Sequence, residues 1–252
     1  MNHLENTLDD AIVDVRHPRA PSSVVIICEH ASPYIPAPFD HLGVAENARR
    51  SHVAWDPGAL ALAEAMAARL NASLIAAKIS RLVYDCNRPP DAPDAMPARS
   101  EIEDVPGNVG LTDAQKSDRV KTYYEPFRLA VAQIIASVAS PILITVHSFT
   151  PVYHGARRDV EIGILHDSDA RLADAILAEA DASHIVRRNE PYGPADGVTH
   201  TLKEHALPHG HLNVMLEIRN DLIENADALT KMADLLSAWI KRALARLQVA
   251  TC

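Results

Sequence analysis

Short apolar runs rich in β-branched residues recur along this chain and alternate with longer stretches whose apolar residues repeat at helical spacing. Apolar runs of this length predict buried strands, and their alternation with helices is typical of an α/β fold with a largely parallel sheet. We therefore expect a three-layer α/β/α sandwich, with helices on both faces of a mixed, largely parallel sheet. The predicted strands are Val24–Cys28, Leu74–Ile79, Pro141–Val146, Val160–Leu165 and Asn213–Ile218.

Capping residues predict where several helices begin. Asp56 is suited to the N-cap of a helix and Pro57 to its first position, where no backbone N–H is needed. Thr112 and Gln115 have the spacing of a capping box, and Pro126 is expected to kink or divide the helical region that follows. Apolar periodicity predicts two further helices, at residues 168–180 and 229–247.

Two segments depart from this regular pattern. Residues 1–20 carry four acidic residues and no apolar stretch, so they do not resemble a signal peptide, and we expect a poorly ordered or peripheral N-terminal segment. Residues 88–110 contain five prolines, which break regular elements. Such a long connection is either a binding loop or a surface excursion. No linker or internal repeat divides residues 1–252, so a single domain is expected.

Composition excludes several classes of protein. The 252-residue chain has a formal net charge of −9, whereas nucleic-acid binding depends on concentrated positive charge. Three cysteines without C-x-x-C spacing argue against a disulfide scaffold and against a thiolate zinc site. No apolar stretch approaches the roughly 20 residues of a membrane span. These features indicate a reduced, cytoplasmic protein that binds neither nucleic acid nor membrane, and nothing among them indicates an oligomer.

Chemically active side chains follow the predicted strands. Histidines stand at the ends of three strands, as His30, His147 and His166, and Glu217 lies near the end of the last one. Ligands of open α/β sheets bind beyond the carboxyl ends of the strands, so we expect these groups to converge on one edge. Each histidine taken alone is also a common loop residue. Histidine is, however, the commonest metal ligand, and several on one edge favour a metal site.

A second group of polar residues begins the proline-rich segment. Arg81, Asn87 and Arg88 follow the second predicted strand within nine residues, 80–88. The guanidinium fork binds a carboxylate through two hydrogen bonds, and an asparagine amide can fix a carbonyl. The alternative is structural, because Asp85 could pair with Arg81 or Arg88 and merely shape the turn. This group therefore predicts either a site for a small anionic substrate or an ion-paired turn.

Six blocks of sequence, in order from about Val24 to about Ile223, resemble the N-formylglutamate amidohydrolase family. The most specific block is Ser-Arg-Leu-Val-Tyr-Asp-Cys-Asn-Arg at 80–88. The others are Glu-His-Ala-Ser at 29–32, Trp-Asp-Pro-Gly-Ala at 55–59, His-Ser-Phe-Thr-Pro at 147–151, Asn-Glu-Pro-Tyr at 189–192 and Leu-Glu-Ile-Arg-Asn-Asp-Leu at 216–222. That family is similar in fold to the zinc carboxypeptidases and aspartoacylases. The resemblance implies a zinc-exopeptidase-like fold and hydrolysis of an N-formyl or N-acyl amino acid, such as N-formylglutamate, in amino-acid catabolism.

The resemblance also implies a metal site. One zinc ion is expected on His30, His147 and a carboxylate, with water in the open position of a tetrahedral site. Asp56 is the carboxylate we favour, and Glu29 is its rival. The choice is open because the family's usual Pro-His-x-Gly is Glu-His-Ala-Ser here, and because Pro33 stands three residues after His30, where carboxypeptidases have their glutamate ligand.

The remaining roles concern catalysis and the substrate. Glu217 is the general base that the resemblance implies, and its alternative role is an ion pair with Arg219 on the same strand face. Arg88 is expected to bind the substrate carboxylate together with Asn87, while Arg81 or Arg219 takes a second carboxylate or polarises the amide carbonyl. The residues expected to bind substrate are Arg81, Asn87, Arg88, Tyr192 and Arg219.

Two alternatives to a metal hydrolase remain open. The protein could be a non-catalytic binding protein for small carboxylates that kept the pocket and lost the metal. It could also be a cysteine-dependent amidase, because Cys28 and His30 lie two residues apart, although a buried structural role suits Cys28 better. No G-x-S-x-G motif supports a serine hydrolase. Surface positions are expected for His52, His154, His184, His200, His209 and His211, and for His205 either a helix surface or a position behind the site residues.

Overall fold

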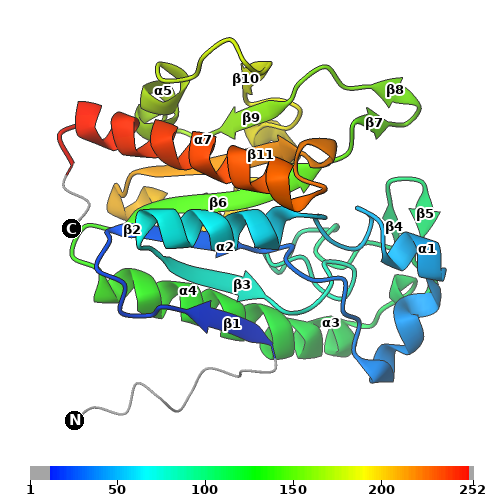
Figure 1. The fold of residues 1–252 in the computed structure, drawn as a ribbon. Helices are drawn as coiled ribbons and strands as arrows, with labels where there is room; N and C mark the ends of the chain where they lie inside the picture. Colours follow the sequence, from blue (N-terminus) through cyan, green and yellow to red (C-terminus); the bar gives the residue numbers. More distant parts are fainter. Residues whose placement is uncertain (1–11, 250–252) are drawn as a thin grey trace.

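The computed structural model describes residues 12–249, and within them seven strands form one sheet in the order β1-β3-β2-β6-β11-β9-β10 (Figure 1). Strands β3, β2, β6 and β11 run parallel to their neighbours in this series, whereas β1 runs antiparallel to β3 and β9 antiparallel to β11. The expected mixed, largely parallel sheet is confirmed. The strands are β1 Val13–Arg16, β2 Val24–Cys28, β3 Ser73–Ala77, β6 Ile142–Phe149, β9 Ile162–Leu165, β10 Val186–Arg188 and β11 Asn213–Arg219.

All five predicted strands are present, with ends that differ by a few residues. The two strands of this sheet that the pattern did not predict, β1 and β10, form its two edges. Both are only partly buried, so neither carries the uninterrupted apolar run of a central strand. Strand β1 lies within the segment expected to be peripheral, and residues 1–11 of that segment lie outside the described residues.

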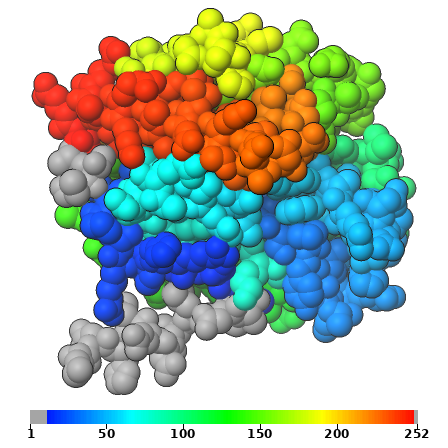
Figure 2. Space-filling model, viewed as in Figure 1, coloured from blue at the N-terminus to red at the C-terminus, as the bar shows by residue number. Residues whose placement is uncertain are grey.

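Helices cover both faces of the sheet, as expected for three layers (Figure 1). Alternate residues of β2 face opposite layers: Val24 and Ile26 contact the first helical layer, and Val25 and Ile27 the second. Figure 2 shows α2 and α7 side by side on the first face. That layer contains α2 Ala59–Leu70, α5 Arg171–Leu177 and α7 Ala226–Arg246, and the second contains α4 Glu125–Ser137 and α6 His200–His205.

Helix α2 begins later than the sequence predicted, and the prediction that Asp56 is its N-cap was wrong. The N-cap is Gly58, whose φ of 83° lies in the left-handed region that favours glycine. A Cβ atom at Gly58 would also lie 2.8 Å from Cδ1 of Ile223. Because the backbone turns at Gly58 before the helix starts, the Asp56 side chain makes no capping bond and is free for other contacts.

The helical region at residues 113–137 begins and divides where the sequence predicted. Thr112 and Gln115 form the predicted capping box at the start of α3, Asp113–Arg119. A π-helical turn at Val120–Tyr124 separates α3 from α4, and Pro126 stands in the first turn of α4, so the region is divided where proline indicated. Helix α7 matches the predicted range within a few residues, whereas α5 is shorter than predicted at both ends.

Two small hairpins and one short α-helix lie outside these layers, together with several short 3-10 helices of the described chain. The proline-rich segment 88–110 contains hairpin β4–β5, and hairpin β7–β8 follows β6; both project at the same end of the molecule (Figure 1). Their bounds are β4 Arg99–Ser100, β5 Glu103–Asp104, β7 Val152–Tyr153 and β8 Ala156–Arg157, and the short helix is α1 Glu46–Arg49. Among the described helices, none has both the length and the apolar character needed to cross a membrane.

Candidate metal centre and active site

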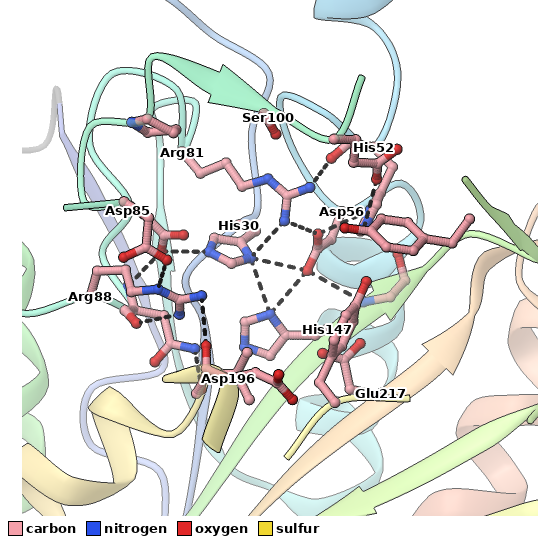
Figure 3. A pocket seen from close by; sticks show the side chains of 18 of the residues that line it. His30, His52, Asp56, Arg81, Asp85, Arg88, Ser100, His147, Asp196 and Glu217 are labelled. Carbon is pink, nitrogen blue, oxygen red and sulfur yellow. Dashed lines mark hydrogen bonds and ion pairs between the residues drawn. The ribbon is translucent and has the colours of Figure 1, made fainter. Parts of the chain in front are cut away.

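Three side chains from separate parts of the chain meet at the carboxyl edge of the sheet (Figure 3). His30 lies two residues beyond β2, Asp56 precedes α2, and His147 belongs to β6. The Nδ1 atoms of His30 and His147 lie 3.2 Å and 2.9 Å from the same Asp56 oxygen, Oδ2. All three side chains are buried, and their facing atoms lie within 4.8 Å of one another. One metal ion could contact all three.

Each histidine has a buried carboxylate on the far side of its ring. Nε2 of His30 lies 2.7 Å from Oδ1 of Asp85, and Nε2 of His147 lies 3.0 Å from Oε2 of Glu29. A carboxylate in this position favours a proton on Nε2, so Nδ1 is the nitrogen that a metal ion would take. Metal-binding histidines are usually oriented in this way. The donor atoms and their orientation therefore fit a metal ion.

The charges of the cluster also favour a cation. Glu29, Asp56 and Asp85 place three buried carboxylates around two imidazoles. Burial disfavours the charged imidazoles, but Asp85 and Asp56 overcome it and raise the pKa of His30. Glu29 and Asp56 likewise raise the pKa of His147 well above its ordinary value, against the effect of burial. Positive charge at this point stabilises the cluster, whether it is carried by protons or by a metal ion.

Arg81 holds the second oxygen of Asp56, and the His52 ring lies close to the same oxygen. Oδ1 of Asp56 lies 3.2 Å from Nη1 of Arg81 and 3.3 Å from Nδ1 of His52. Arg81 also donates to the carbonyls of His52 and Val53, which ties its guanidinium to this loop. The prediction of a surface role for His52 was wrong, because its side chain is buried. Burial lowers the pKa of His52 to about 3, and the charge of Arg81 acts in the same direction, so His52 is neutral.

Glu217 lies next to this cluster on the neighbouring strand. Strand β11 places it in register with His147 on β6 and opposite Gly163 on β9. A Cβ atom at Gly163 would lie 3.1 Å from Cβ of Glu217, so the missing side chain leaves room for the first carbon of the Glu217 side chain. Burial raises the pKa of Glu217 to about 7. The alternative ion pair is not formed, because Arg219 binds Asp221 at 2.8 Å instead.

A cavity of about 340 Å³ opens at this edge of the sheet. Two of the residues proposed from sequence do not line it: Glu29 lies behind the His147 ring, and Arg219 binds carbonyls of the segment before β9. Strand β6 contributes His147 to the cavity wall and β11 contributes Glu217, as parallel neighbours should. The predicted site residues that line the cavity are His30, Asp56, Arg81, Asn87, Arg88, His147, Tyr192 and Glu217.

Asn87 and Arg88 are fixed at the cavity by contacts with a distant segment. Nε of Arg88 lies 2.7 Å from Asp94, and its Nη1 donates to the Gly197 carbonyl at 3.1 Å. The Asn87 amide donates to the carbonyl of Val198 at 2.5 Å. These bonds join the start of the proline-rich segment to the loop before α6. The pair is therefore held rigidly at the cavity, with several of its donors already in use.

Comparison with known proteins identifies the family. The model of the N-formylglutamate amidohydrolase family matches residues 22–224. The chain belongs to this family. A solved structure of a gene product from Agrobacterium tumefaciens has 51% sequence identity and a TM-score of 0.93, covering 94% of this chain and 96% of that one. The N-formylglutamate amidohydrolase from Ralstonia eutropha JMP134 has 19% identity and a TM-score of 0.67, covering 94% and 98%, and shares the fold. No curated protein matches the sequence.

The family resemblance read from the six sequence blocks is thereby confirmed, and the protein is a hydrolase of the N-formylglutamate amidohydrolase type. Blocks that lie far apart along the chain meet at the cavity: the first supplies His30, the second Asp56, the fourth His147 and the last Glu217. This convergence explains why short motifs that lie far apart in the sequence together identify one family: their residues form one site.

The sequence analysis misplaced His52 and His166, and it missed two residues of the site. His52 and His205 are buried and not at the surface, so the helix-surface position offered for His205 was wrong. His166 does not join the cavity, because β9 runs antiparallel to β11 and carries His166 to the opposite edge. Asp85 and His52 were not proposed as site residues, although both line the cavity. Asp85 lies in the most specific block, and its bond to His30 replaces the ion pair with an arginine that we had considered. His52 gave no signal beyond its spacing of four residues before Asp56.

Proposed function

We propose that this protein hydrolyses the amide bond of an N-formyl or N-acyl amino acid, such as N-formylglutamate, with one zinc ion bound by His30, Asp56 and His147. One observation carries the proposal. Two Nδ1 atoms and one carboxylate oxygen converge in a buried site, at the same cavity as Glu217, which stands in register with His147. The family supports the class of reaction, because its name describes hydrolysis of the formyl amide of glutamate.

The three proposed ligands suit zinc. Imidazole nitrogen and carboxylate oxygen both bind Zn²⁺ in compact tetrahedral sites, and three protein ligands leave a fourth position open. When bound, zinc would lower the pKa of a water molecule and polarise the carbonyl of the scissile amide. The protein's own contribution is orientation. Asp85 and Glu29 fix the two histidine rings, and Arg81 fixes Asp56.

Glu217 is the proposed general base. Its pKa of about 7, raised by burial, suits a group that must accept and release a proton near neutral pH. In the proposed reaction, Glu217 accepts a proton from the water that attacks the formyl carbon. It then gives this proton to the amide nitrogen as the C–N bond breaks, which yields formate and the free amino acid. Its position in register with His147 supports this role.

The substrate carboxylate is proposed to bind Arg88, with Asn87 beside it. Arg88 lines the cavity, and its ion pair with Asp94 together with the Gly197 carbonyl holds the guanidinium in one position. A guanidinium fixed in this way loses little freedom when it binds an anion, which favours affinity. The chain as a whole is acidic, so local positive charge must attract the substrate.

The cysteine-dependent alternative finds no support in the geometry. Cys28 and Cys86 are both buried, and neither lines the cavity. Burial raises the pKa of each thiol well above its ordinary value, whereas a nucleophilic cysteine needs a lowered pKa. Each of the two cysteines packs among apolar side chains of the core.

A panel of N-formyl and N-acetyl amino acids, assayed with zinc-loaded protein, tests the proposal. Wild type should release free amino acid from at least one N-formyl substrate. Glu217→Gln should retain its zinc and lose about 10²- to 10⁴-fold in kcat. Full activity in Glu217→Gln would contradict the role of general base. Binding of the panel compounds without any hydrolysis by wild type would instead identify a carboxylate-binding protein.

A further inference from the structure

The side chain of Asn87 is bonded to the start of α6 rather than left free in the cavity. It is buried, and its Oδ1 accepts hydrogen bonds from the backbone N–H of Thr201 at 3.0 Å and from the Thr201 hydroxyl at 3.2 Å. Its Nδ2 donates to the carbonyl of Val198. Both lone pairs of Oδ1 are therefore in use, together with one N–H of the amide. The sequence analysis offered this amide to a substrate carbonyl, but the protein itself takes most of its hydrogen bonds.

The backbone N–H of Asn87 holds the carboxylate that faces His30. It donates to Oδ1 of Asp85 at 2.9 Å, and the same oxygen lies 2.7 Å from Nε2 of His30 (Figure 3). The direction of the Asp85 carboxyl therefore depends on where the backbone of Asn87 lies. The Asn87 side chain sets that position, because it anchors the turn at residues 85–88 on α6.

Arg88 relies on the same support. Its Nη1 donates to the Asn87 carbonyl at 3.0 Å and to the Gly197 carbonyl at 3.1 Å. The turn at residues 85–88 thus contacts residues 197–201 through both its asparagine and its arginine. The proposed function assigns Asp85 to the metal site and Arg88 to the substrate, so a change in this attachment should reach both.

Thr201 also acts on the second histidine. Glu29, which lies 3.0 Å from Nε2 of His147, is completely buried. Against the effect of burial, the charge of His147 lowers the pKa of Glu29, and the Thr201 hydroxyl acts in the same direction. A hydroxyl that supports an ionised carboxylate helps to keep it oriented toward its partner. The first turn of α6 therefore stands behind the carboxylates of both histidines.

We propose that Asn87 is a positioning residue, which ties the turn at residues 85–88 to Thr201 on α6 and thereby holds His30 in the orientation that binds metal. The inference rests on the proposed function, because it concerns the same metal site. It differs from a substrate-binding role for Asn87 in one measurable respect. A positioning residue affects metal affinity when no substrate is present, whereas a residue that only contacts substrate does not.

Zinc affinity without substrate tests the proposal. Competition with a coloured chelator should show a dissociation constant about 10-fold higher in Asn87→Ala, the lower end of the usual loss for contacts behind a metal ligand. Asn108→Ala is the matched control, because the buried Asn108 bonds the Leu82 and Pro97 carbonyls near the same turn but not Asp85. Its zinc affinity should equal that of wild type, and an equal weakening in both variants would overturn the proposal. A higher KM in Asn87→Ala at unchanged zinc affinity would overturn it too, since Asn87 would then bind substrate.

Two variants of Thr201 test the bridge with a smaller change. Thr201→Val removes the hydroxyl but keeps the backbone bond to Asn87, and should raise the zinc dissociation constant about 3-fold. Thr201→Ser keeps the hydroxyl and should retain the wild-type constant. Because Thr201→Val removes only one of the bonds to Asn87, it gives a result even if Asn87→Ala does not fold. Identical constants in the two Thr201 variants would overturn the proposal.

A measurement without zinc separates this proposal from the proposed function. In the metal-free protein, NMR follows the imidazole N–H of His30 that faces Asp85. Exchange of this proton with solvent should be faster in Asn87→Ala and Thr201→Val than in wild type and Asn108→Ala, because the Asp85 carboxyl is held less firmly. That result supports the bridge even if wild type binds no zinc and hydrolyses no substrate. Equal exchange rates in the four proteins overturn it, whatever the catalytic activity.

Discussion

Nε2 of His147 lies 3.0 Å from Oε2 of Glu29, on the side of the imidazole opposite Asp56, although Glu29 directly precedes His30 in the sequence. The Glu29 side chain is completely buried. The residue that the sequence offered as a rival metal ligand thus contacts a histidine that is itself a proposed ligand. A carboxylate in this position orients the ring and increases its basicity.

We expect Glu29→Gln to weaken zinc binding about 10- to 100-fold, because the amide can accept the Nε2 proton but supplies no negative charge. The dissociation constant can be measured by competition with a coloured chelator. Glu224→Gln removes an exposed carboxylate and should leave the constant unchanged. Loss of one zinc ligand would be more severe, so a Glu29→Gln protein that retains no zinc at all would favour direct ligation by Glu29.

His147→Ala should abolish stoichiometric zinc binding as well as activity. The substitution removes one of the three atoms that converge on the site and leaves the Glu29 carboxylate without its partner. Metal content per protein chain, measured by elemental analysis after purification, gives the result directly. His166→Ala, at the opposite edge of the sheet, is the matched control and should retain full zinc. Stoichiometric zinc in His147→Ala would remove His147 from the ligand set.

The stability of the metal-free protein should depend on pH through Glu217. Burial raises its pKa from 4.5 to about 7 in the folded state, so folding binds this proton more tightly. The free energy of unfolding of wild type must then fall as pH rises between about 4.5 and 7. The side chain of Glu217→Gln does not titrate, so the variant does not show this fall. We expect the variant and wild type to be equally stable at about pH 4, and the variant to gain relative stability up to about pH 7. Urea unfolding across this range measures the difference, and a constant difference would contradict the raised pKa.

Gly163→Ala should disturb catalysis by displacing Glu217. The added methyl group would lie 3.1 Å from Cβ of Glu217 and would clash with the Glu190 carbonyl. We expect a loss of about 1 to 3 kcal/mol in the free energy of unfolding. We also expect a fall in kcat greater than the rise in KM, because the base moves more than the substrate site. Gly193→Ala is the control, because Gly193 also lacks a left-handed backbone and a Cβ atom there would meet its nearest neighbours at an ordinary 3.5 Å. A free energy of unfolding equal to that of wild type in Gly163→Ala would contradict the close packing around Gly163.

Arg88→Lys should raise KM about tenfold or more with little effect on kcat. Lysine keeps the positive charge but loses the planar fork and its geometry toward a carboxylate. Steady-state kinetics on the preferred N-formyl substrate measures both parameters. Arg99→Lys is the control, since Arg99 is paired with Asp104 on hairpin β4–β5 near the mouth of the cavity. An unchanged KM in Arg88→Lys would show that the guanidinium geometry of Arg88 does not contribute to substrate binding.

The sequence by itself determined the central strands of the sheet and the family of the protein. Apolar runs such as Val24–Cys28 predicted the central strands because strands buried on both faces must be continuously apolar. Parallel neighbours then had to bring His30, His147 and Glu217 to one edge. The edge strands β1 and β10 were not predicted, since half-exposed strands lack that pattern.

Only the tertiary structure decided which partner each polar side chain takes. Sequence could not say which of Asp56 and Glu29 faces Nδ1 of His147 and which faces Nε2, because that depends on how the loops around Gly58 and His30 fold. It placed His166 at the wrong edge, because strand direction is set by pairing with a distant strand. Hydrogen bonds and ion pairs act over a few ångströms, and residues separated by many positions reach that range only after the sheet and loops have assembled.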